Sequence, residues 1–275
     1  MKLEDIQPAH CYARAQRLLA EVTLIRDEMG RNEDGRPVPE ITGAQPREVY
    51  FETLAAWSKV QRLSSELGLQ MVRAAPPSPS LREVRPGHVL QLLDTVVAAI
   101  DGVKRRLDIS ETSTEPAIES SRQPSDVLAT VIRINRELSR ALERPFTPTD
   151  VYRTVALAST YAVRLGAVAD LAPFVRRRKP SDCYARLEAC LAKVTELVGK
   201  QGQTALAARG TPKEIVPGDV YDMASLVLGE LAYLHAMSSA AAAVHAFEPG
   251  SAGRVLPAHV DQLARTLEAQ LATIK

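Results

Sequence analysis

The sequence predicts an all-α protein made of eight copies of one long amphipathic helix. Three observations predict this fold. A proline-containing start recurs eight times, and each start is followed by apolar residues at helical spacing. Aromatic residues make up only 4% of the chain, whereas hydrophobic residues make up 45%. Such a composition favours close packing of helices, because sheets are enriched in aromatic and β-branched residues.

The repeated start has the form xPx[D/H]VY, and its leading residue defines position one of each copy. Position two is always proline: Pro8, Pro46, Pro86, Pro124, Pro148, Pro180, Pro217 and Pro257. Position four is an acid or a histidine: His10, Glu48, His88, Asp126, Asp150, Asp182, Asp219 and His259. Position five is Val in six copies and Cys in two, and position six is Tyr in five copies.

The residues that follow each start form one apolar stripe. Positions five, nine, twelve, sixteen and nineteen are apolar, so the steps between them are four, three, four and three residues. In the sixth copy these positions hold Cys183, Leu187, Cys190, Val194 and Leu197. This spacing puts all five side chains on one helix face, whereas a strand would alternate every two residues.

The start itself is a signal for the beginning of a helix. Proline lacks an N–H group and has a fixed φ, so it fits the first turn. In the copy TPTD, Thr147 can be the N-cap residue with Asp150 three positions later, an acidic variant of the capping box. In a second register, Ser181 would cap its helix instead. In both registers the position-four side chain faces unpaired backbone N–H groups.

The spacing of the copies predicts two tandem four-helix units, 1–145 and 146–275, with long proline-containing linkers. Successive prolines of the starts are 32–40 residues apart, except for 24 residues between Pro124 and Pro148. This short connection predicts that the fourth and fifth helices are antiparallel neighbours. The other linkers could also run back along a helix, which would make successive helices parallel. A continuous solenoid is the rival arrangement.

Charge and hydropathy limit the class of protein. The net charge is only +1, and neither half is strongly basic, which argues against a nucleic-acid partner. No apolar run approaches the roughly 20 residues of a transmembrane helix, and the first ten residues lack the apolar core of a signal peptide. We expect a soluble protein, either cytoplasmic or exported after removal of a leader. Arginine exceeds lysine and alanine is abundant, which favours a GC-rich bacterial gene.

The cysteines are predicted to be inert core residues. Cys11 and Cys183 stand where other copies have Val, and Cys190 stands at another apolar position. Cys183 and Cys190 are about 10 Å apart along one helix, too far for a disulfide between them.

The histidines of the starts are predicted to cap helices. His10, His88 and His259 replace an acid, and a neutral imidazole can accept a hydrogen bond from a backbone N–H group. We expect no metal site and no cofactor, because the sequence has no HExxH motif, no paired CxxC motifs and no EF-hand loop. We also identify no catalytic residue.

Two groups of residues are candidate binding sites. The recurring tyrosines could form a row at the helix starts that binds an anionic or sugar-like ligand, although rings packed between helices would give the same pattern. They are Tyr12, Tyr50, Tyr152, Tyr184 and Tyr221. The basic run Arg176, Arg177, Arg178 and Lys179 could dock an acidic partner or a membrane surface, although such runs are commonly just solvated.

These features lead to three hypotheses about function. The first is a non-catalytic helical-repeat scaffold or binding protein that associates with a protein partner or with itself. The second is a small-molecule sensor or binding domain with a pocket between helices. The third is an enzyme that uses His and Tyr at the helix starts.

Overall fold

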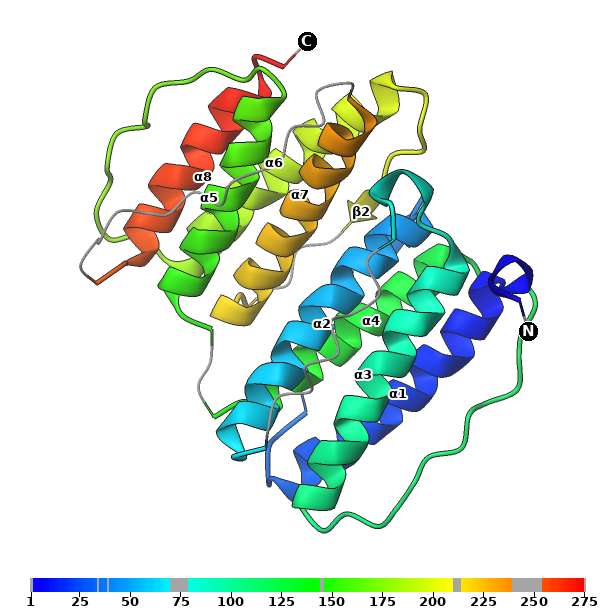
Figure 1. Ribbon diagram of the computed structural model, residues 1–275. Coiled ribbons are helices and arrows are strands. Elements are labelled where there is room, and N and C mark those ends of the chain that lie inside the picture. Colours follow the sequence, from blue (N-terminus) through cyan, green and yellow to red (C-terminus); the bar gives the residue numbers. More distant parts are fainter. Residues whose placement is uncertain are drawn as a thin grey trace. The chain divides into compact units, whose positions relative to one another are not determined.

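The computed structural model describes residues 2–33, 35–38, 40–69, 79–143, 146–209, 214–238 and 254–274. Helices dominate these residues, so the protein is all-α as expected (Figure 1). The eight α-helices of this part are α1 (Pro8–Glu28), α2 (Pro46–Glu66), α3 (Pro86–Arg106), α4 (Pro124–Ala141), α5 (Pro148–Arg164), α6 (Pro180–Lys200), α7 (Pro217–Met237) and α8 (Pro257–Leu271). None of these described helices combines the length and apolar character needed to cross a membrane.

Each of these helices begins at the proline of the repeated start, so the first of the two predicted registers is observed. The residue before the proline is the N-cap, with extended backbone angles in every case. The alternative register, in which Ser181 caps α6, is wrong because Lys179 is the N-cap. Proline occupies N1 at no cost, since the N–H group there has no partner inside the helix.

Four short elements of the described residues lie outside the eight α-helices. Two are 3₁₀ helices, η1 (Leu3–Asp5) and η2 (Leu81–Glu83). The other two are the strands β1 (Glu40–Thr42) and β2 (Ala207–Arg209), which pair antiparallel with Ile41 opposite Ala208. These strands could not be predicted from the sequence, because three residues are too few for an alternating pattern to stand out.

The chain divides into two compact units. Unit 1 contains residues Met1–Pro145 together with Leu206–Pro212, and unit 2 contains Phe146–Ala205 together with Lys213–Lys275. Independent folding of 1–145 and 146–275 stays a prediction. The two units differ from these bounds in one respect, because Leu206–Pro212 belongs to unit 1. The antiparallel pairing of the fourth and fifth helices stays a prediction, because α4 belongs to unit 1 and α5 to unit 2.

The two units share one pattern of helix neighbours. In unit 1, α1 and α2 each pack against both α3 and α4. In unit 2, α5 and α6 each pack against both α7 and α8. In unit 1, α1 therefore lies diagonally across the bundle from α2, and α3 lies diagonally from α4. The same holds in unit 2 for α5 with α6 and for α7 with α8. Advancing every helix by four reproduces the neighbours of unit 1 in unit 2, which agrees with a tandem origin of the halves.

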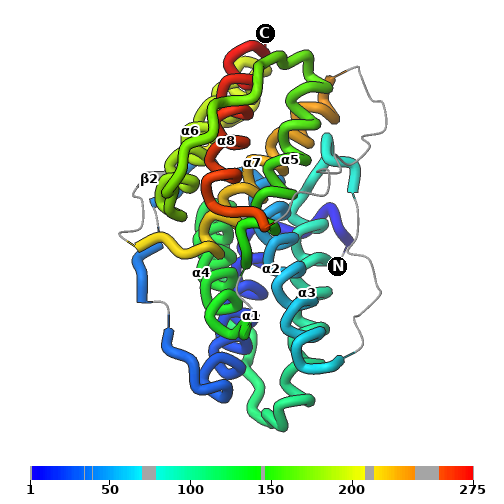
Figure 2. Tube along the Cα trace, turned by 90° about the vertical axis from the view of Figure 1, so that its left-hand side faces the viewer, coloured from blue at the N-terminus to red at the C-terminus, as the bar shows by residue number. Residues whose placement is uncertain are grey.

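The four helices of each unit are parallel. Their starts meet at one end, because the four start prolines of unit 1 line one apolar cluster and those of unit 2 line another. The Cys11 thiol at the start of α1 donates to the carbonyl of Pro86 at the start of α3, 3.2 Å away. Near the opposite end, Arg26 of α1 binds Glu137 of α4 at 2.7 Å. Linkers must therefore return to the starting end, as the one after α5 does along α8 (Figures 1 and 2).

The predicted apolar stripe forms the core of each bundle. All five stripe residues of α6 are buried, and so are the equivalent residues of α3. At position sixteen, Ile100, Leu138, Val194 and Leu231 are each 0% exposed. The stripe therefore faces the bundle axis in both units.

Replacing Ile100 by Ala should lower the free energy of unfolding by about 2–5 kcal/mol, because it leaves a cavity in the core of unit 1. Urea denaturation of the full chain measures this change. A loss below about 0.5 kcal/mol, which is usual for a surface site, would contradict the burial of the stripe.

Candidate functional site

The meeting point of the helix starts is closed by apolar side chains. In unit 1 it is lined by the position-two prolines and the position-five residues Cys11, Val49, Val89 and Val127. The equivalent residues line the cluster of unit 2. The spaces left are about 10 Å³ and 40 Å³, which is room for about one water molecule. These clusters are cores at the bundle ends and leave no room for an organic ligand.

The position-four side chains cap all eight described helices. Each accepts a hydrogen bond from the backbone N–H of the position-one residue of its own helix, at 2.7–3.1 Å. The acceptor is a carboxylate oxygen in five helices and a histidine Nδ1 in α1, α3 and α8. Among the eight N-cap residues of these helices, only Thr147 also uses its side chain, whose hydroxyl accepts a hydrogen bond from the backbone N–H of Asp150 at 3.4 Å.

The histidines of the starts therefore have a structural role. His10 and His88 lie in unit 1 and His259 in unit 2, and each uses Nδ1 for its cap. Among the described residues, no three His, Cys, Asp or Glu side chains are grouped as a metal ion would require.

The five predicted tyrosines are divided between the two units. Tyr12 and Tyr50 belong to unit 1 and the other three to unit 2, and none lines the apolar clusters of the helix starts. The Tyr12 ring lies under the Arg122 guanidinium at 4.3 Å, and the Tyr221 ring stacks on Phe146 with centroids 4.0 Å apart. Tyr50 and Tyr184 are buried, whereas Tyr152 is partly exposed.

The three cysteines join neighbouring parallel helices. The Cys183 thiol donates to the carbonyl of Pro257 at 3.3 Å, and the Cys190 thiol donates to that of Ala264 at 3.5 Å. Burial raises the pKa of each of the three thiols to about 12. Since the thiolate is the nucleophile, we expect these groups to be unreactive in the folded protein.

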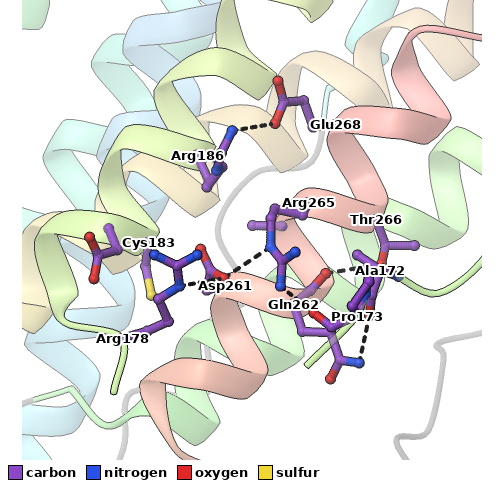
Figure 3. A network of polar contacts seen from close by, with 12 residues as sticks. Ala172, Pro173, Arg178, Cys183, Arg186, Asp261, Gln262, Arg265, Thr266 and Glu268 are labelled. Carbon is purple, nitrogen blue, oxygen red and sulfur yellow. Dashed lines mark hydrogen bonds and ion pairs between the residues drawn. The ribbon is translucent and has the colours of Figure 1, made fainter. Parts of the chain in front are cut away.

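The basic run after α5 is only partly available to a partner. Arg178 forms an ion pair with Asp261 of α8 at 3.1 Å, and Asp261 is only 1% exposed. Arg265 binds the same carboxylate at 3.0 Å (Figure 3). Arg176, Arg177 and Lys179 are exposed. The interaction with Asp261 thus uses one of the four cations to hold the linker.

Asp261 was not among the site residues predicted from the sequence, although its position in the repeat could have indicated an ion pair. Asp261 stands at position six, where five other copies have Tyr. A carboxylate at a position that becomes buried requires a cation nearby, because an unpaired buried charge is strongly unfavourable. The neighbouring Arg178 and Arg265 fulfil this requirement.

The linker 165–179 is bound to α8 along its length. The backbone N–H groups of Val168 and Ala172 donate to the hydroxyls of Thr273 and Thr266, each at 3.0 Å. In return, Gln262 donates to the carbonyl of Ala172 at 2.8 Å, and Arg265 donates to that of Pro173 (Figure 3). These bonds fix an extended segment whose apolar side chains are exposed.

A scan of protein-family models gives no match to this chain, and searches of curated proteins and of solved structures give none either. Its function is therefore argued from its own residues.

The cysteine geometry predicts resistance to thiol reagents. A disulfide reagent such as DTNB should react negligibly with the native protein at mildly alkaline pH, because burial keeps the thiols protonated. The three thiols should all react once guanidinium chloride unfolds the chain. Rapid reaction of any thiol in the native protein would contradict the assigned burial.

Proposed function

We propose that this protein is a non-catalytic scaffold that associates with further copies of itself through two linkers of opposite charge. The proposal rests on one observation. The linker after α5 presents exposed apolar residues next to exposed cations, and the linker after α3 presents an exposed apolar residue among carboxylates.

The basic linker has the features of a docking ridge. Val168, Leu171 and Phe174, at intervals of three residues, are 76%, 66% and 43% exposed. Exposed apolar residues grouped in this way are characteristic of interaction sites. Because the backbone is already held by α8, little conformational entropy is lost when a partner binds.

The acidic linker supplies a complementary surface. Residues 107–122 contain four carboxylates and one cation, Arg122, which pairs with Glu119 at 2.8 Å, and Ile118 between the carboxylates is 55% exposed. The linker is also held in place. The N–H of Ser113 donates to the buried Glu21 carboxylate at 2.8 Å, and Arg14 binds Glu115 at 2.7 Å.

The two linkers carry opposite charges and lie in different units, so the contact joins different surfaces of two copies. Such a head-to-tail contact produces rings or open chains of copies. Complementary charges would accelerate association and make it depend on salt. The exposed apolar residues of the two linkers would supply the burial that stabilises the contact.

The third hypothesis, an enzyme that uses the helix starts, is not proposed. His10, His88 and His259 use Nδ1 to accept a backbone N–H group, and the apolar clusters beside them have no room for a substrate.

Sedimentation velocity of the full chain over a range of concentrations tests the proposal. The wild type should associate at low salt and dissociate as salt is added. The charge reversal Arg176→Glu/Arg177→Glu should weaken association by about tenfold or more, because it places like charges at the contact. The reversal Glu111→Lys/Glu119→Lys should do the same.

An equimolar mixture of the two charge-reversed variants is the decisive arm, because complementary charges then meet again between different chains. The mixture should associate although neither variant does so alone. The reversal Arg153→Glu, at an exposed arginine of α5 outside the ridge, is the matched control and should change nothing. A wild type that stays monomeric at all concentrations, or a mixture that does not associate, would overturn the proposal.

A further inference from the structure

A cleft lies between α5 and α8 of unit 2. It has a volume of about 300 Å³ and is lined by Ala156, Ser159, Thr160, Val163, Arg164, Leu263 and Gln270. The two helices lie side by side in both views (Figures 1 and 2). A volume of this size is at the lower end of the range for small-molecule sites, about 300–1,000 Å³.

The equivalent helix pair of unit 1 shows how the cleft arises. There α1 takes the place of α5 and α4 the place of α8, and cross-helix bonds close the groove. Gln16 at position ten of α1 donates to Thr130 at 3.3 Å, and Leu19 at position thirteen is only 8% exposed. In α5, positions ten and thirteen hold the smaller Ala156 and Ser159.

A third difference opens the end of the cleft. In unit 1, Arg26 at position twenty of α1 binds Glu137 of α4 at 2.7 Å. Position twenty of the α5 copy is Gly166, which lies beyond the end of α5 at Arg164 and has a φ of 88°. The residue equivalent to Glu137 is Gln270. The cleft therefore lies where unit 1 makes its two bonds across the groove.

Two polar groups that line the cleft can donate to a ligand, the Gln270 amide nitrogen and the Arg164 guanidinium, because the Ser159 and Thr160 hydroxyls already donate to protein oxygens. The Ser159 hydroxyl donates to Gln270 Oε1 at 2.6 Å, and among the described residues no hydrogen bond from the Gln270 amide nitrogen is found. The Arg164 guanidinium likewise has no ion-pair partner in the described part of the chain, and the lining residues include no carboxylate. The apolar wall consists of Ala156, Val163 and Leu263.

We infer that the cleft binds a small organic carboxylate with a compact apolar body. The carboxylate lies between the Arg164 guanidinium and the Gln270 amide, both of which donate hydrogen bonds suited to an anion. The apolar body packs against Val163 and Leu263. This site is separate from the linker ridge of the proposed function, so either can fail without the other.

Isothermal titration calorimetry of the full chain with benzoate tests the inference. Benzamide has the same shape without the charge, and acetate has the charge without the apolar body. Benzoate should bind saturably, and both comparison compounds should bind about tenfold or more weakly. No saturable binding of benzoate at millimolar concentration would overturn the inference, as would equal affinity for benzamide.

Variants locate the binding. Arg164→Ala should weaken benzoate binding by about tenfold, the usual effect of losing one charge-assisted hydrogen bond. Ser159→Leu copies the residue found in unit 1 and should abolish binding while the thermal unfolding midpoint is kept. If that variant unfolds, Ala156→Gln fills the cleft from the adjacent position. Arg153→Ala, at an exposed arginine of the same helix, is the control. Unchanged binding in Ser159→Leu and Ala156→Gln would place the ligand elsewhere.

Discussion

The common direction of the four helices in each unit is the constraint on which the rest of the structure depends. Aligned helices bring four positive dipole ends together, and each such end gains about 0.3–1 kcal/mol from a nearby negative group. The position-four acids meet this requirement in five helices, and in the other three a histidine Nδ1 provides a neutral acceptor. Proline at N1 removes one unpaired N–H group from each crowded helix start.

The same constraint explains several of the buried polar residues. A helix of 21 residues is about 32 Å long, and a linker must cover that distance to reach the next start. An extended linker has unpaired backbone groups, which must find partners. Helix side chains provide them: Arg136 donates to the carbonyl of Pro37 at 3.0 Å, the buried Glu21–Lys104 pair holds the linker after α3, and Asp261 holds Arg178. These three linkers are thus held against the helices, and the proposed contact between copies uses two of them, those after α3 and α5.

Much of the fold could be predicted from the sequence because one local signal is repeated eight times. The helix starts and the buried stripe follow from the prolines and the spacing of residues such as Ile100 and Val194. The parallel direction could not be predicted, because the same stripe faces the axis in either direction. The cleft between α5 and α8 could not be found either. The cleft arises because α5 lacks counterparts of Gln16 and Leu19 of α1. This difference can be recognised only when α1 and α5 are known to be equivalent.

The parallel direction is tested most directly by distances between spin labels in unit 1. The native cysteines are first replaced by Val or Ala, and labels are placed at Gln7 with Gln123, or at Gln7 with Glu143. α1 and α4 are neighbours, and α4 is about 27 Å long over its 18 residues. Parallel helices require the distance from Gln7 to Gln123 to be much shorter than that from Gln7 to Glu143. The reverse order would show antiparallel helices and contradict the account.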